Sequence, residues 1–200
     1  MKNENIKQKL LNDLENYLGD DISMINHLKE VMGFAEKILK EENGDWDIII
    51  PASILHDVGT KVVKEKYFLT TAHRQEKEGS KLAREILLKN EIKKEDIDEI
   101  CEIIAHHHSP KRIETLNFKV LYDADYIVNL KYKVNPIRKV VALVFSFSNW
   151  IVKPLFGSFV LFNAEFFSVV NMENKLKLEK IINKVFLTGA GKKIAKKVYL

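Results

Sequence analysis

The chain has 200 residues, of which 46% are apolar, and this is enough for one globular domain with a sizeable core. Its formal net charge of +4 at pH 7 is low. The basic residues are spread along the sequence, which argues against a nucleic-acid-binding protein and is compatible with phosphorylated substrates. A single cysteine, Cys101, excludes internal disulfides and favours the reducing cytoplasm as the location.

Apolar residues recur every three or four positions, which predicts an all-α fold. Gly19, Asn43-Gly44 and Ser109-Pro110 are the expected ends of three helices. Residues 60–70 are predicted to form a loop, because Gly59 is expected to end the helix before it. The predicted helices span residues 4–18, about 21–42, 47–57, 72–89, 95–108 and 116–132.

Three inward-facing polar residues stand out in this helical pattern. His27 lies three residues after Met24 and four before Val31, on an apolar helix face. His56 and Asp57 are adjacent within the apolar string ILHDVG. Burying an imidazole beside a carboxylate is costly unless something binds both. A bound cation would remove that cost.

Helical phase separates the remaining candidates. In the helix over 95–108, the apolar stripe of Ile100, Cys101 and Ile104 continues to His107 and His108, whereas His106 points away. In the helix over 116–132, the stripe of Phe118, Leu121 and Tyr122 includes Asp125, and Asp123 lies off it. Imidazole and carboxylate together form a ligand set for divalent metals. The pattern therefore predicts a metal-dependent hydrolase site built from helices.

With these residues in order, the sequence resembles the HD-domain superfamily of metal-dependent phosphohydrolases over residues 20–132. The resemblance rests on the strings IPASILHDVGT, EGSKLAREIL, EIIAHHHSPK and LYDADYIVNL. It implies an all-helical bundle whose metal ligands are a distant His, an adjacent His-Asp pair and a later Asp. Here these are His27, His56, Asp57 and Asp125. The family's later Asp follows an Ala, which agrees with the choice of Asp125 by phase.

The resemblance also bears on a second metal ion. Dinuclear family members add ligands that correspond to His107 and His108, together with a His on the preceding helix. That helix reads Gln75-Glu76-Lys77-Glu78 here, and His73 comes too early, so Glu76 is the available substitute. We therefore expect one tightly bound Mn, Fe, Co, Ni or Mg ion and a weaker second ion at most.

The expected activity is attack of a metal-activated water on a phosphomonoester or nucleotide. Asp57, Glu76 or His107 would act as the base, and Lys61, Lys111 and Arg112 would bind the phosphate. Thr60 replaces a Glu that family nucleotidases and alarmone hydrolases carry three residues after the His-Asp pair. A nucleotide-binding sensor without turnover therefore stays open as an alternative, as does a less favoured di-iron oxygenase.

The sequence divides into a helical core over 1–132 and a helical extension over 133–200 that is expected to pack on it. The extension holds a C-terminal helix at about 175–200 and an apolar insert at about 137–170, with seven of the eleven Phe. The longest run without charge, Val140–Val152, is too short to span a bilayer. The insert is expected to cover the bundle or form a homodimer interface, and contact with a membrane surface is the next alternative.

Overall fold

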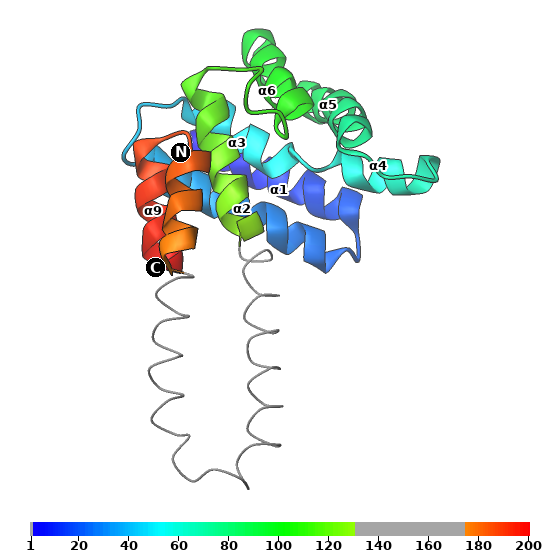
Figure 1. The fold of residues 1–200 in the computed structure, drawn as a ribbon. Helices are drawn as coiled ribbons and strands as arrows, with labels where there is room; N and C mark the ends of the chain where they lie inside the picture. Colours follow the sequence, from blue (N-terminus) through cyan, green and yellow to red (C-terminus); the bar gives the residue numbers. More distant parts are fainter. Residues whose placement is uncertain (1, 131–174) are drawn as a thin grey trace, which may run out of the picture.

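The computed structural model describes residues 2–130 and 175–200, and every regular element in these ranges is an α-helix (Figure 1). The predicted all-α fold is confirmed. The helices are α1 (Lys2–Leu18), α2 (Ile22–Leu39), α3 (Trp46–Leu55), α4 (Gly59–Lys66), α5 (Ala72–Lys89), α6 (Lys94–His106), a helix over 116–130, a helix over 175–185, and α9 (Gly189–Tyr199).

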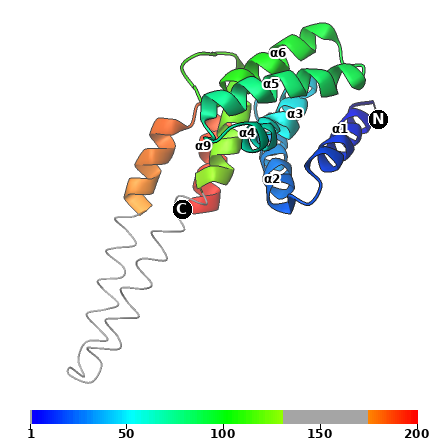
Figure 2. The ribbon, with the colours of Figure 1, turned by 90° about the vertical axis from the view of Figure 1, so that its right-hand side faces the viewer.

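Helix α3 forms the centre of the bundle. All its residues from Ile48 to Leu55 are buried, because each is apolar or small. It packs against α1 and α2 on one side and against α6 on the other (Figure 2). The Asp45 carboxylate caps α3 by accepting a hydrogen bond from the backbone N–H of Asp47. The C-terminal end of this buried helix carries His56 and Asp57 into the interior.

The prediction of a loop over residues 60–70 is wrong for the first part of this range, where the chain forms α4. Gly59 begins this helix, and its missing side chain allows close packing. A Cβ atom at Gly59 would lie 2.2 Å from the carbonyl oxygen of Gln75 and 2.5 Å from the backbone nitrogen of Gly79. The glycine therefore serves the contact between α4 and α5, and does not end a helix.

The prediction of one continuous C-terminal helix over 175–200 is also wrong, because the chain is not helical at residues 186–188. The Phe186 side chain is buried there, and Thr188 caps α9 by accepting a hydrogen bond from the Gly191 N–H. The buried Asp123 carboxylate accepts hydrogen bonds from the backbone of Leu187 and Thr188 and from the Thr188 hydroxyl.

Helix α9 is attached to two parts of the core. Asp123 ties the two residues just before α9, Leu187 and Thr188, to the helix over 116–130. Glu42 Oε1, just beyond α2, accepts a hydrogen bond from the Ala190 N–H at 2.9 Å. These carboxylates lie at the positive end of the α9 dipole and stabilise it. The backbone N–H groups of Thr188 and Ala190 are thus already hydrogen-bonded to the chain's own acidic side chains.

The expected packing of the 137–170 insert and the boundary at 132–133 lie outside the described residues. Within the ranges that the structure describes, no helix combines the length and the apolar character needed to cross a membrane. The helix over 175–185 does contact the core, where Ile182 and Phe186 are buried and the Phe186 ring meets the Tyr126 ring edge-on at 5.5 Å.

Candidate metal centre

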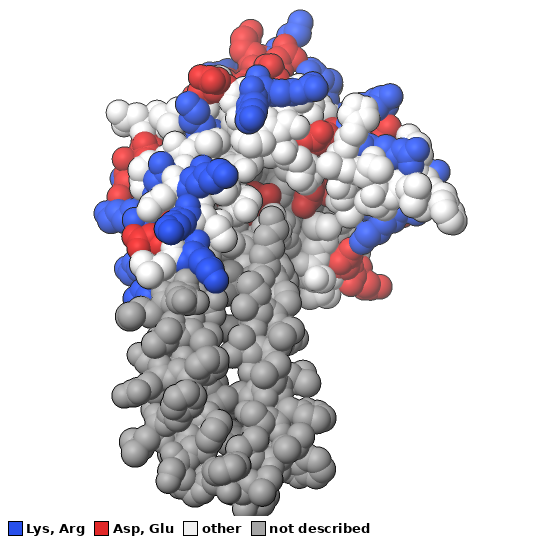
Figure 3. All heavy atoms as spheres, viewed as in Figure 1, with Lys and Arg blue, Asp and Glu red and all other residues white. Residues whose placement is uncertain are grey.

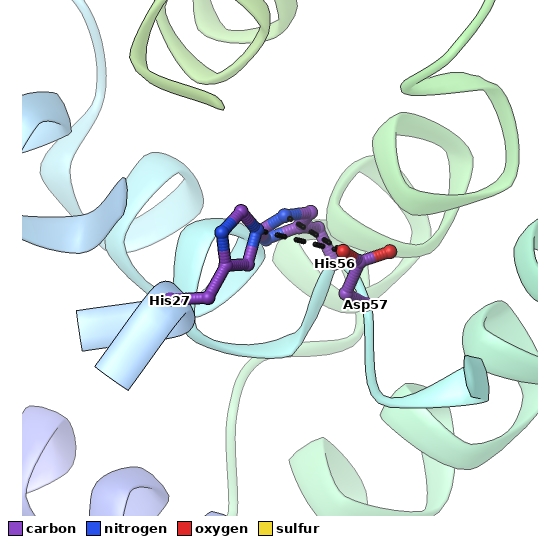
Figure 4. A group of neighbouring side chains, drawn as sticks. All are labelled: His27, His56 and Asp57. Carbon is purple, nitrogen blue, oxygen red and sulfur yellow. Dashed lines mark ion pairs between the residues drawn. The ribbon is translucent and has the colours of Figure 1, made fainter. Parts of the chain in front are cut away.

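Four side chains from three separate parts of the chain meet beside the end of α3. His27 comes from α2, His56 and Asp57 directly follow α3, and Asp125 comes from the helix over 116–130. His27 Nε2 lies 3.5 Å from Asp57 Oδ2 and 3.4 Å from Asp125 Oδ1. His56 Nε2 lies 3.6 Å and 3.5 Å from the same two oxygens. Figure 4 shows the two imidazoles directed at the Asp57 carboxylate.

The histidine nitrogens in this cluster are oriented for a ligand. His56 Nδ1 pairs with the carbonyl oxygen of Ser53 at 2.9 Å, and His107 Nδ1 pairs with that of Ile104 at 2.8 Å. A carbonyl only accepts, so Nδ1 carries a hydrogen in both rings, and Nε2 keeps its lone pair when the ring is neutral. The Nε2 atoms of His27, His56 and His107 are buried without a hydrogen-bond partner among the described residues.

Asp57 joins two groups of histidines. Its Oδ2 faces His27 and His56, whereas its Oδ1 lies 3.5 Å from His107 Nε2. His27, His56 and Asp57 form one group that could hold a metal ion, and Asp57, His107 and His108 form another. The imidazoles of His56 and His107 make a perpendicular contact at 5.2 Å, so the two groups are continuous. A single carboxylate therefore borders both.

The electrostatics of the cluster favour charged carboxylates. Burial opposes ionisation of Asp57, yet the imidazoles of His56, His107 and His27 hold its pKa well below the usual value. The pKa of Asp125 is likewise lowered, against burial, by His27 and His56. Burial acts against protonation of His27, but Asp125 and Asp57 raise its pKa to about 9. The centre thus offers fixed negative charge to a cation.

Glu76 lies beside the second group. Its carboxylate is buried, and Oε1 accepts a hydrogen bond from the His108 backbone N–H at 3.0 Å and lies 3.5 Å from His108 Nδ1. The close approach of α4 and α5 at Gly59 and Gly79 brings this part of α5 near the His-Asp pair. Gln75 is directed elsewhere, since its amide donates to the Thr60 hydroxyl at 3.0 Å.

The residues that helical phase selects are the ones that face the cluster in the structure. His107 is buried in the cluster and His108 lies at its edge, with 37% of its side chain exposed. His106 is in neither group of candidate ligands among the described residues. Asp125 faces His27 and His56, while Asp123 is buried against residues 187–188.

The predicted phosphate-binding residues have different surroundings. The Lys61 ammonium donates to the Tyr17 carbonyl at 2.7 Å and lies 5.1 Å from the centre of the Tyr17 ring, so it ties α4 to α1. Lys111 and Arg112 are exposed in the turn that follows His108. The structure thus gives Lys61 a partner inside the bundle and leaves the other two at the surface.

Sequence reasoning missed one residue that contacts the cluster. Asn129 donates a hydrogen bond from Nδ2 to Asp125 Oδ1 at 2.8 Å and so fixes the orientation of that carboxylate. The sequence signal was that Asn129 lies four residues after Asp125, since residues four apart share one face of a helix. Residues that orient ligands in this way tune metal affinity.

The donor set fits a divalent transition metal. Three buried imidazole Nε2 atoms and two ionised carboxylates converge, and none of the three nitrogens has a hydrogen-bond partner among the described residues. Buried polar atoms normally have a partner, and unpaired ones indicate a missing ligand. Nitrogen and oxygen donors suit Mn²⁺, Fe²⁺, Co²⁺ and Ni²⁺.

Fold and site together define an all-helical protein with a buried histidine–aspartate cluster that can hold metal. The family model for the HD domain matches residues 24–130, more than half of the chain, and the protein belongs to the HD-domain family. This range contains every side chain of the cluster.

Comparison with solved structures finds a crystal structure described as a predicted HD superfamily hydrolase from an uncultured Thermotogales bacterium. The TM-score is 0.54 and the identity 22%, over 80% of this chain and 92% of that one. At this identity the likeness establishes the fold alone. No curated protein matches the chain.

Proposed function

We propose that this chain is a metal-dependent phosphohydrolase that acts on a phosphomonoester or a nucleotide. The observation that carries the proposal is the convergence of three buried, unpartnered Nε2 atoms on the carboxylates of Asp57 and Asp125. Membership of the HD-domain family and the likeness to a protein described as a hydrolase support it. His27, His56, Asp57 and Asp125 would hold the first ion, and His107 and His108 would border a second.

A bound divalent ion lowers the pKa of a coordinated water and neutralises charge on a phosphoryl oxygen. The chain must then supply a proton acceptor within hydrogen-bond reach of that water. Among the three candidates, Asp57 is the weakest base because the surrounding imidazoles lower its pKa. Glu76 and His107, on the Oδ1 side of Asp57, are the better candidates, with Lys111 and Arg112 as the phosphate ligands.

A second candidate function is nucleotide binding without turnover. It is favoured by position 60, where a buried threonine hydroxyl accepts a hydrogen bond from Gln75 in place of a free carboxylate. A hydroxyl held in this way cannot act as the general base that a glutamate would provide. Such a protein would hold its metal and its nucleotide but would release no phosphate.

Phosphate release from a panel of nucleotides and sugar phosphates tests the proposal. The purified chain is loaded separately with Mn²⁺, Fe²⁺, Co²⁺, Ni²⁺ and Mg²⁺, with a chelated sample and Asp125→Asn as controls. We expect metal-dependent release that the variant loses. Nucleotide binding without release would favour the sensor, and oxygen consumption by the iron-loaded protein without phosphatase activity would favour the oxygenase.

A further inference from the structure

The charge of this protein is divided sharply between its two parts and is not spread evenly. Residues 1–130 carry nineteen Lys and Arg against twenty-five Asp and Glu, whereas residues 131–200 carry thirteen against three. The low net charge of +4 therefore hides an acidic HD domain and a strongly basic C-terminal part. Charge asymmetry of this kind indicates a separate interaction surface.

Three lysines and one isoleucine form a stripe along one face of the helix over 175–185. These four residues are exposed and follow helical spacing: Lys177, Lys180, Ile181 and Lys184. The opposite face contains the buried Ile182. Figure 3 shows lysine and arginine side chains gathered over the C-terminal helices. We call these four residues the lysine stripe.

The lysine stripe differs from an ordinary solvated helix face. None of its three lysines forms an ion pair with another described residue, whereas on α9 Lys193 pairs with Glu41 and Lys196 with Glu179. The acidic residue within this helix, Glu179, is thus already engaged. In the middle of the stripe the Ile181 side chain is 42% exposed. Ammonium groups that have no ion-pair partner among the described residues, and that surround an exposed apolar side chain, suit an anionic surface that also has an apolar layer.

The position of the stripe in the chain points to the same kind of surface. The described range 2–130 stops, and the range 175–200 begins, at the end of the bundle where the C-terminus also lies (Figures 1 and 2). Residues 131–174 are therefore joined to the described structure beside the stripe. In that sequence, residues 140–172 contain a single Lys, a single Glu and seven Phe, and residues 131–139 contain four basic residues and no acidic one.

We propose that the lysine stripe binds the surface of a lipid bilayer that contains anionic phospholipids. The lysines would pair with lipid phosphates, and the exposed Ile181 side chain among them would reach the boundary of the acyl layer. A membrane fits better than a nucleic acid, because nucleic-acid surfaces offer phosphate without an adjoining apolar layer. The acidic HD domain would be repelled by the same surface, which orients its centre away from the lipid.

Sedimentation of the full-length chain with vesicles tests this proposal. The chain is mixed with vesicles of phosphatidylcholine alone or with added phosphatidylglycerol, at low and at high salt. We expect binding to the anionic vesicles that weakens as salt rises, and much weaker binding to the neutral ones. Equal binding to both kinds, or none to either, would overturn the proposal. A lipid-free dimer that ignores both vesicles would assign the apolar sequence to self-association.

Matched variants locate the binding surface. Lys177, Lys180 and Lys184 are changed together to Gln, and the control changes the exposed Lys77, Lys93 and Lys94, which carry the same charge on α5 and at the start of α6. A lysine near an anionic bilayer contributes roughly fivefold to partitioning, so the loss of three lysines should weaken binding by about a hundredfold. The control should bind like the wild type. An equal loss of vesicle binding in both variants would show that net charge alone attracts the protein, and it would contradict binding through the lysine stripe.

Thermal unfolding and RNA binding distinguish a lipid-binding stripe from a structural one and from a nucleic-acid interface. Thermal unfolding of the stripe variant should match the control, since the three ammonium groups have no described partner to lose. If the stripe variant instead loses binding to RNA while neither protein sediments with vesicles, the surface is a nucleic-acid interface and the membrane proposal is wrong.

Discussion

Asp57 and His107 lie fifty residues apart, yet Asp57 Oδ1 approaches His107 Nε2 to 3.5 Å while the other oxygen of the same carboxylate faces His27. One side chain thereby borders both groups of candidate ligands. Its negative charge is shared between them, so a change at this position should affect both.

Asp57→Asn and His56→Ala should each abolish tight metal binding, because both remove a donor from the first group and Asp57 also serves the second. The matched control is Asp47→Asn on the preceding helix α3, where the carboxylate is exposed. Metal content is measured on purified proteins by elemental analysis. Metal retained at the wild-type level in either variant would contradict the assignment of that residue as a ligand.

Asp125→Asn and Asp123→Asn should fail in different ways. The first should lose metal and keep its fold, since Asp125 faces His27 and His56. The second should keep metal but lose stability, because the carboxylate satisfies three donors from residues 187–188. We expect about 2–4 kcal/mol of destabilisation, or roughly 5–15 °C in Tm. Equal metal loss would mean that both carboxylates face the centre.

Glu76 should matter for a second ion and Gln75 should not. Glu76→Ala removes the carboxylate beside His108 and should leave one bound ion, while the first ion keeps its affinity. Gln75→Ala is the control, because its amide contacts Thr60 instead. Isothermal titration with Mn²⁺ gives the number of ions bound by each protein. If the wild type and Glu76→Ala both bind a single ion with the same affinity, the protein has no second site.

Metal binding should release a proton from His27 at neutral pH. Burial lowers its pKa, but Asp125 and Asp57 raise it to about 9, so the imidazole is protonated at pH 7 in the metal-free protein. A protonated Nε2 has no lone pair for a ligand bond. Metal affinity should therefore rise with pH up to about 9 and then level off. Calorimetric titration with metal in buffers of different ionisation enthalpy gives the number of protons released on binding. The His27→Gln variant should release fewer protons than the wild type.

Asn129→Ala should weaken metal binding without removing a ligand. Its amide holds Asp125 Oδ1 at 2.8 Å, and loss of such an orienting contact typically costs 10–100-fold in metal affinity. Asn129→Asp, which places a second carboxylate there, should disturb the orientation of Asp125 by repulsion. Affinities equal to the wild type in both variants would show that packing alone orients Asp125.

Much of the cluster could be predicted from the sequence because helical phase is regular. His27, His107 and Asp125 each fall on an apolar stripe, and a polar residue on such a stripe must face the interior. The His-Asp pair needed no phase, since it stands within an apolar string. Phase does not give the contacts between helices. The Glu76–His108 contact depends on how closely α4 approaches α5, which the sequence shows only as Gly59 and Gly79.

The incorrect predictions share one cause, which is that glycine and polar residues were interpreted locally. Gly59 was expected to end a helix, but its role is the close contact with α5. Residues 186–188 continue an apparently helical pattern, but Thr188 and the buried Asp123 together provide a better arrangement for the backbone N–H groups. In both places a tertiary contact outweighs local preference.

The packing of Asp123 against Gly191 restricts how this chain can vary. A methyl group at position 191 would stand 2.2 Å from Asp123 Oδ2, so no larger residue fits while the aspartate keeps its place. The two positions are therefore expected to be inherited together: relatives that retain the acid at 123 should retain glycine at 191. Relatives that lose one should lose the other, and such co-variation would mark those whose last helix docks in this way.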